Sequence, residues 1–457
     1  MIKLDKITMP SIDNDIRPIQ LTDETLNNRK TKLLQKMTEE HLDAVIIYAD
    51  LEHGGNFEYL TGFVPRFEEA LLVLHANGKA FLILGNENLN KAPLARIKAE
   101  AIHMPQLSLP NQPMDTALSI AQILNQAQID HAKSIGLIGW KKFTSSTDDN
   151  SVLYDLPYFL VEGLMETSPI AQFKNATDLM IGATGVRTTN NENEIAHYEF
   201  GAMLAGNGIL SAMDQLEIGK SEMEVGSYLN TAGQTPSVVT IMATGERFEK
   251  ANLYPTTKKI QLGDCISMTV GYKGGLQSRG GYAVRMTEEL PEEERAYLDR
   301  VAKPYFNAIT TWLEKIKIGR TGGEIYELIE EVLPKEKYGW HLNPGHLCAD
   351  EEWLASPIYP ESTEIIQSGM LFQLDIIPSV PGFSGVSCEG GIVLADQNLR
   401  LRMQAEYPEM WTRMQARRNY MIETLGIHLS EEILPMSNAT AYYRPYFLDK
   451  ESAFINC

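Results

Sequence analysis

The sequence has few cysteines, no long apolar run and no excess of basic charge. Its 457 residues include four cysteines, which form no CxxC pair and no dense disulfide framework. No apolar run approaches the length of a membrane span, and the first residues contain no apolar signal core. The formal net charge of −20 disfavours nucleic acids and anionic membranes as partners. We therefore expect a cytoplasmic protein with reduced thiols.

The sequence also lacks the short motifs of several enzyme classes. It contains no HExxH helix, no GxSxG elbow, no Walker loop and no GxGxxG after a predicted strand. Hydrophobic residues make up 44% and charged residues 22%, values that are ordinary for a globular protein with a large core. The length allows two or three domains.

The first half of the chain alternates between strand and helix patterns, which is typical of an α/β domain. Residues 42–48 predict a strand, and Asn77-Gly78 predicts a hairpin turn between two further strands. The second half opens with a predicted helix over residues 191–216. Capping boxes that begin at Ser221 and Thr321 predict further helices.

The residues that point to chemistry lie between positions 341 and 396. His346 stands in a Pro-Gly turn, Asp375 lies inside an apolar run, and Glu389 is followed by two glycines. Residues 370–378 predict a strand, so Asp375 is expected to be desolvated and to need a partner or a proton. Glu389 could be that partner if its strand pairs with the first. A structural carboxylate that accepts from backbone amides is the alternative.

Several sequence landmarks occur in an order that is similar to that of a known family. They are residues 56–63 (NFEYLTGF), Glu194-Ile195, Gly219 with Glu224, Ala243-Thr244-Gly245, Gly263-Asp264, Gly345-His346, residues 369–378 (GMLFQLDIIP) and Glu389. In this order they resemble the pita-bread hydrolases aminopeptidase P, prolidase and creatinase, and NFEYLTGF resembles a strand-and-turn signature of the N-terminal domain.

This resemblance implies an α/β N-terminal domain and an α+β pita-bread C-terminal domain. We place a creatinase-like N-terminal domain at residues 1–185, the pita-bread catalytic domain at residues 186–400 and a helical extension at residues 401–457. The family also implies a homodimer.

The resemblance further implies a pair of divalent metal ions, held by two Asp, one His and two Glu. The His position falls on His346, the first Glu position on Asp375 and the second on Glu389. Thr269 stands where the first Asp is expected, and the second falls near Arg279 or Gly280.

No acidic residue lies between Asp264 and Glu288, so neither Asp ligand can be supplied by a shifted alignment. Two adjacent divalent ions need bridging carboxylates to offset their mutual repulsion. We therefore expect no metal cofactor, with a single weakly bound divalent ion as the alternative.

The accessory histidines of the family are absent as well. Asn252 and Trp353 stand at the two positions. Creatinase resembles this chain because it keeps the His and the two acids without the Asp ligands. The resemblance favours an enzyme, a metal-independent hydrolase of a C–N bond in a small cationic or zwitterionic compound. The alternatives are an Xaa-Pro-type aminopeptidase or dipeptidase with a single-metal site, and a non-catalytic binding module.

We expect His346 to act as general acid and base, since imidazole titrates near neutral pH. Asp375 and Glu389 would orient a water molecule or hold a cationic group. The alternatives are a turn histidine, and a relic ion-pair network of the two acids with Arg279 or Arg285. The expected substrate-binding residues are Arg285, Tyr282, Asn252, Thr269, Phe63 and Arg66.

Overall fold

The computed structural model describes residues 1–14, 16–230, 232–250 and 253–457. The chain divides into two compact units, one of residues 21–188 and the other of residues 1–20 together with 189–457. The predicted boundary near residue 185 thus lies close to the observed one. Residues 1–20 differ from the expectation, because they join the C-terminal unit.

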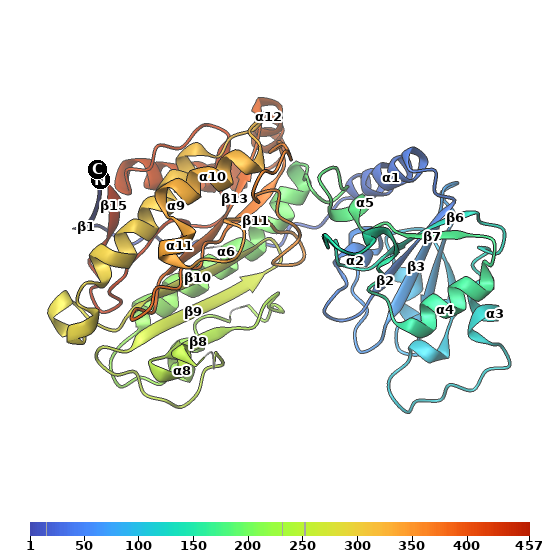
Figure 1. Cartoon of the computed structure of the whole chain (residues 1–457), viewed down its shortest axis with the longest axis horizontal. Helices are drawn as coiled ribbons and strands as arrows, with labels where there is room; N and C mark the ends of the chain where they lie inside the picture. Colours follow the sequence, from blue (N-terminus) through green and yellow to red (C-terminus); the bar gives the residue numbers. More distant parts are fainter. Residues whose placement is uncertain (15, 231, 251–252) are drawn as a thin grey trace. The chain divides into compact units, whose positions relative to one another are not determined.

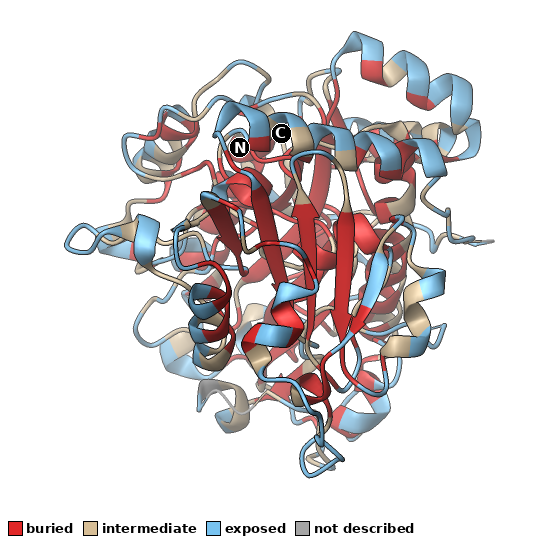
Figure 2. Cartoon of the chain, turned by 90° about the vertical axis from the view of Figure 1, so that its right-hand side faces the viewer, coloured by how far each residue is buried: buried red, intermediate tan, exposed pale blue. Residues whose placement is uncertain are grey.

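The unit of residues 21–188 is an α/β domain (Figure 1). Its elements are α1 (Asp23–Glu39), β2 (Ala44–Ala49), α2 (Gly55–Thr61), β3 (Ala70–His75), β4 (Ala80–Leu84), β5 (Glu100–His103), α3 (Ile120–Asn125), β6 (Ser134–Ile138), α4 (Tyr158–Thr167), β7 (Gln172–Asn175) and α5 (Asp178–Ile181). Its six strands have the order β5-β4-β3-β2-β6-β7. The central strands β2, β3 and β4 are buried along almost their whole length, whereas the edge strands β5 and β7 are largely exposed or half-buried. Figure 2 shows buried strands together with helices whose outer faces are exposed.

Two local predictions in this unit have different outcomes. The Asn77-Gly78 hairpin is confirmed, since β3 and β4 pair as antiparallel neighbours and Gly78 has the positive φ of 83° that such a turn requires. The strand-and-turn reading of NFEYLTGF is wrong, because this segment forms α2, which ends at Gly62 in the left-handed conformation. Its aromatic and apolar side chains are buried on the helix.

The second unit is built on an antiparallel sheet in the order β11-β12-β13-β10-β9-β8, with β14 paired to β13. Its elements are β1 (Ile2–Lys6), α6 (Glu192–Gln215), α7 (Glu222–Gly226), β8 (Ile241–Thr244), α8 (Glu246–Glu249), β9 (Cys265–Tyr272), β10 (Gly275–Tyr282), α9 (Lys303–Lys315), α10 (Gly322–Val332), α11 (Lys335–Tyr338), β11 (His346–Leu347), β12 (Leu371–Leu374), β13 (Ser387–Leu394), α12 (Gln397–Glu406), α13 (Pro408–Asn419), β14 (Ile433–Pro435) and β15 (Ser452–Asn456).

Helix α6 packs against strands β9 and β10. It begins with a capping box at Asn191, and the predicted capping boxes at Ser221 and Thr321 are also formed. The β9 side chains Ile266, Met268 and Val270 join the buried cluster of α6. Because side chains alternate along a strand, Thr269 belongs to the opposite face of the sheet.

The chain ends are tied to this unit and do not form a separate helical extension. Strand β1 pairs with β15 near the C-terminus, and β14 extends the main sheet beside β13 (Figure 1). Helix α13 and the π-helical turn that continues it lie within the predicted extension. Among the described residues, every helix is too short or too polar to cross a lipid bilayer.

Candidate active site

The three residues of the predicted site share one face of the sheet in the C-terminal unit. His346 in β11 stands opposite Gln373 in β12, and Gln373 stands opposite Gly391 in β13. Cross-strand partners lie on the same face, and so do residues two apart along a strand. Asp375 directly follows the end of β12, and Glu389 lies in β13, two residues before Gly391. The two strands pair, and this was the condition on which Glu389 could be a partner of Asp375.

A second carboxylate, Glu352, completes the surroundings of His346. The Nε2 atom of His346 lies 3.0 Å from Oε1 of Glu352 and 3.8 Å from Oδ2 of Asp375. His346 is fully buried, and Asp375 is 4% exposed. The Glu352 side chain retains 22% of its accessible surface, so the cluster reaches solvent on this side.

The hydrogen bonding of His346 fixes the role of each ring nitrogen. Nδ1 lies 3.1 Å from the carbonyl oxygen of Leu347, and because a carbonyl only accepts, Nδ1–H is the donor. Nε2 therefore faces the carboxylates of Glu352 and Asp375. Burial alone would lower the pKa of His346, but these two carboxylates raise it above its ordinary value. The negative charges of the two carboxylates thus favour the protonated imidazole.

The buried carboxyl groups have raised pKa values. Burial raises the pKa of Asp375 to about 6, a shift that His346 opposes and Glu352 reinforces. Burial, followed by the charge of Asp375, raises the pKa of Glu389 well above its ordinary value. The Ser387 hydroxyl donates to Oε1 of Glu389 at 3.0 Å. The two acids therefore differ, since the pKa of Asp375 is about 6 and burial holds that of Glu389 well above its ordinary value.

Glu352 is the site residue that sequence reasoning missed. It lies six residues after His346 in the acidic run of residues 350–352, which has the pattern of a solvated loop. The chain turns back there, and Leu347 and Ala355 form a bridge that brings Glu352 beside the imidazole. Trp353 accompanies it and stacks on the imidazole ring. No local spacing rule predicts this return.

The residues that replace the family's two Asp ligands do not suit a dinuclear metal centre. Thr269 and Ser278 are cross-strand partners, and their hydroxyl oxygens hydrogen-bond to each other at 2.8 Å. At Gly280, an added Cβ would lie 2.9 Å from backbone atoms of Gly385 and Ser387. Gly280, one of the two candidate positions for the second Asp, is thus closed by another segment of the chain. The other position carries the guanidinium of Arg279, so a pair of ions would lack both bridging ligands.

Arg279 is buried and donates to backbone carbonyls. Its Nη1 lies 2.6 Å from the oxygen of Ser278 and 2.7 Å from that of Glu389, and its Nε lies 2.8 Å from that of Tyr442. Arg285 pairs with Glu289 at 3.2 Å. In the described part of the chain, neither guanidinium contacts the carboxylate of Asp375 or Glu389. Within the described ranges, no ion pair supports the alternative of a relic network, although the charge of Arg279 acts to lower the pKa of Glu389.

The other expected substrate-binding residues are not brought to His346 by any described contact. The Arg285 side chain is 56% exposed. The Tyr282 hydroxyl accepts from the Ser384 amide at 2.9 Å and donates to Glu294 at 3.2 Å, a structural connection between loops. Asn252 lies outside the described residues.

Phe63 and Arg66 belong to the unit of residues 21–188. Phe63 packs edge-on against Phe57, with ring centroids 5.4 Å apart, and Arg66 is exposed. Their expected part in substrate binding stays a prediction.

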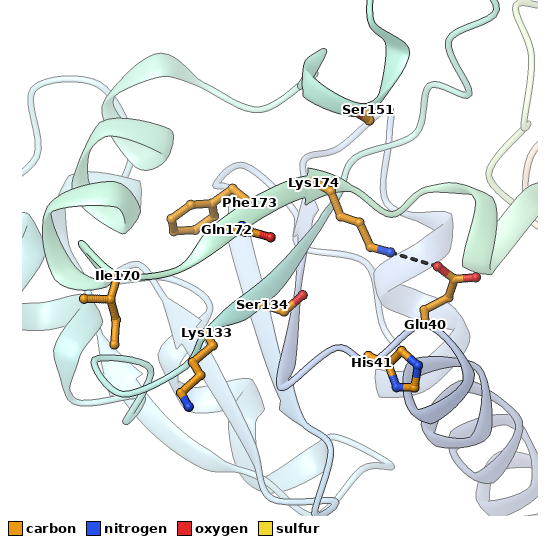
Figure 3. Close-up of a pocket in the computed structure, with 9 residues that line it drawn as sticks. All are labelled: Glu40, His41, Lys133, Ser134, Ser151, Ile170, Gln172, Phe173 and Lys174. Atoms are coloured by element: carbon orange, nitrogen blue, oxygen red, sulfur yellow. Dashed lines mark hydrogen bonds and ion pairs between the residues drawn. The ribbon is translucent and has the colours of Figure 1, made fainter.

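A surface depression of about 1060 Å³ lies in the same unit (Figure 3). It is lined by Glu40, His41, Lys133, Ser134, Ser151, Ile170, Gln172, Phe173 and Lys174. Figure 3 shows Lys174 directed at Glu40, and their charged atoms are 2.8 Å apart. This pairing offsets the positive charge of Lys174, and the depression contains none of the predicted site residues. The buried cluster around His346 is therefore the stronger candidate for chemistry.

Two protein-family models match the chain. The Creatinase/Prolidase N-terminal domain matches residues 29–179, and Metallopeptidase family M24 matches residues 197–396. The Xaa-Pro dipeptidase of Pyrococcus horikoshii is 20% identical over 384 residues, which cover 81% of this chain and 95% of that protein. A second Xaa-Pro dipeptidase, from Pyrococcus furiosus, is 21% identical over 285 residues, covering 59% of this chain and 79% of that protein.

Solved structures are similar in fold. The Xaa-Pro dipeptidase from Bacillus anthracis superposes with a TM-score of 0.62 at 18% identity, covering 82% of this chain and 96% of that chain. The prolidase from Pyrococcus horikoshii gives a TM-score of 0.60 at 20% identity, covering 81% and 96%. These likenesses confirm the expected fold of a creatinase-type N-terminal domain followed by a pita-bread domain.

Proposed function

Because the chain belongs to the pita-bread hydrolases of the creatinase, aminopeptidase P and prolidase type, we propose that it hydrolyses a C–N bond in a small cationic or zwitterionic compound without a metal cofactor. The observation that carries this proposal is the position of His346 Nε2, buried between Glu352 at 3.0 Å and Asp375 at 3.8 Å. A protonated imidazole beside an ionised carboxylate forms an acid–base pair.

In the proposed reaction, Asp375 accepts a proton from the attacking water and His346 donates its Nε2 proton to the departing nitrogen. The C–N bond breaks as the C–O bond forms, and one water is consumed for each amine released together with an acid (from an amide) or a urea (from a guanidino compound). Asp375 suits the base role because its pKa of about 6 leaves it mostly ionised at neutral pH. The negative charges of Asp375 and Glu352 favour a substrate with a cationic group.

The test is amine release by the purified chain after treatment with a chelator. The panel consists of guanidino compounds, N-acylated diamines and Xaa-Pro dipeptides. We expect release from a cationic member that is lost in His346→Ala and retained in His131→Ala, because the side chain of His131 is 94% exposed. Release that appears only after a divalent metal is added would overturn metal independence and favour a single-metal Xaa-Pro peptidase.

The peptidase alternative has its own support, since both curated relatives named above are Xaa-Pro dipeptidases. The positions of the accessory histidines count against it, because Trp353 fills one of them and stacks on His346. A binding module would release no amine from any compound. It would instead bind a panel member equally well with and without the His346 side chain.

A further inference from the structure

The cluster around His346 contains two buried polar atoms without an aligned hydrogen bond. They are Nε2 of His346 and Oδ1 of Asp375. Glu352 lies 3.0 Å from Nε2, but the donor geometry of a hydrogen bond is not met. Leaving such atoms buried without partners costs about 1–3 kcal/mol each, more when they are charged. Their position against two carboxylates indicates a place for a small cation.

The ligand-type atoms of this cluster converge on one point. One nitrogen or oxygen atom from each of His346, Glu352 and Asp375 lies within 4.8 Å of the other two. Metal–ligand bonds of about 2.0–2.2 Å separate two ligands on opposite sides of one ion by roughly 4.4 Å. Only a few tenths of an ångström of adjustment would therefore be needed, and the partly exposed Glu352 can supply it.

The donor set suits a transition-metal ion. An imidazole nitrogen with two carboxylates is the combination found in two-acid, one-histidine sites for Zn²⁺, Mn²⁺ or Fe²⁺. The second ring nitrogen, Nδ1, donates to the Leu347 carbonyl, the type of outer contact that orients a metal-binding histidine. Trp353 stacks on the ring and holds its plane.

We propose that one divalent transition-metal ion binds between His346, Glu352 and Asp375. This site differs from the dinuclear centre implied by the family, because Glu352 lies outside that ligand set and Glu389 is not needed. Oε1 of Glu389 accepts from the Ser387 hydroxyl at 3.0 Å, and Glu389 does not belong to the group of converging ligand atoms. The closed position of Gly280 leaves no second pair of ligands, so the stoichiometry is one ion per chain.

This ion and the proposed acid–base reaction compete for the same atom. A metal bond at Nε2 removes the lone pair that would otherwise carry the proton donated to the leaving nitrogen. In the proposed metal-independent reaction the ion is therefore an inhibitor, and this consequence rests on the proposed function. Binding itself does not, since it requires only the three side chains.

Isothermal titration of the chelator-treated full chain with MnCl₂ and with ZnCl₂ tests the site. We expect one ion per chain for at least one of the two metals. Glu352→Gln should weaken binding at least about tenfold, as loss of a ligand contact does. Glu389→Gln, which alters a buried carboxyl of the same cluster, should change the Kd less than about threefold. Circular dichroism confirms that each variant is folded.

Three results would overturn the site: no saturable binding of either metal, two ions per chain, or a loss of affinity in Glu389→Gln with none in Glu352→Gln. His346→Ala should abolish metal binding. If this variant is unstable, His346→Asn serves in its place and should give the same result. The proposed reaction is judged separately, because amine release that requires the ion would contradict metal independence while leaving this stoichiometry intact.

Discussion

The imidazole ring of His346 stacks on the indole ring of Trp353, with ring centroids 4.1 Å apart and ring planes 22° apart. His346 is therefore confined by Trp353 on one ring face, by the Leu347 carbonyl at Nδ1 and by Glu352 at Nε2. A tryptophan supplies a large rigid surface with little loss of side-chain freedom. The stack keeps Nε2 directed at the two carboxylates.

Substitution of Trp353 should affect both stability and the environment of His346. We expect Trp353→Ala to lower the free energy of unfolding by about 1–3 kcal/mol, because stacking and apolar burial are both lost. Trp353→Phe, which keeps an aromatic face, should lose less than half as much. Urea denaturation measures the change, and the NMR signals of the His346 ring protons should move in the Ala variant only.

A matched stack in the other unit provides the control for this prediction. His53 and Trp140 stack with centroids 4.4 Å apart and planes 13° apart. Trp140→Ala should leave the His346 signals unchanged. An equal shift of those signals in both variants would contradict a local role for Trp353.

Substitution of Asp375 should change how stability depends on pH. The pKa of this carboxyl in the folded chain, about 6, is above its ordinary value of 3.8. A raised pKa means that the folded state binds the proton more tightly, so its contribution to stability is complete below pH 4 and is lost as pH rises through 6. At pH 8 the ionised carboxylate lowers the free energy of unfolding by up to about 3 kcal/mol.

Asp375→Asn removes the buried charge. We therefore expect the variant to be more stable than the natural chain at pH 8 but not at pH 4. Urea denaturation between pH 4 and pH 8, with a chelator present, measures the difference. Asp115→Asn, a substitution of an exposed aspartate, serves as the control. A difference between the natural chain and Asp375→Asn that is constant over this pH range would contradict the raised pKa.

Sequence periodicity predicted the part of the site that lies on regular strands. Strand alternation and antiparallel pairing are short-range rules, and they were enough to bring Asp375 and Glu389 to one face. Glu352 escaped prediction because its place depends on a loop that returns to β11. The β1–β15 pairing, which joins residues at opposite ends of the chain, likewise has no local signal.

The closed position at Gly280 should tolerate no side chain. Gly280 and Gly391 lie on the same face of the sheet, but an added Cβ at Gly391 would make ordinary contacts, the nearest at 3.6 Å. We expect Gly280→Ala to lose about 1–3 kcal/mol, since backbone must move, and Gly391→Ala to lose much less. Urea denaturation of the two variants makes the comparison, and equal losses would contradict the closure.

The same contact predicts that the dinuclear centre cannot be rebuilt by substitution at the two Asp positions. Thr269→Asp should fold, because the Thr269 hydroxyl bonds to another hydroxyl, that of Ser278, at 2.8 Å. The double variant with Gly280→Asp should be strongly destabilised and should not bind two Mn²⁺ ions per chain. Two bound ions in a folded double variant, counted by titration calorimetry, would show that residues 385–387 can withdraw.

The first twenty residues should stabilise the C-terminal unit through Asp13. Its Oδ2 accepts from Nη2 of the buried Arg417 at 2.9 Å, and Nη1 of the same guanidinium lies 2.8 Å from Glu199. We expect Asp13→Ala to lower the free energy of unfolding by about 1–3 kcal/mol, because a buried charge loses a partner. Asp23→Ala, which removes the exposed ion pair with Arg96, should have no measurable effect. Equal effects in urea denaturation would mean that residues 1–20 do not anchor this unit.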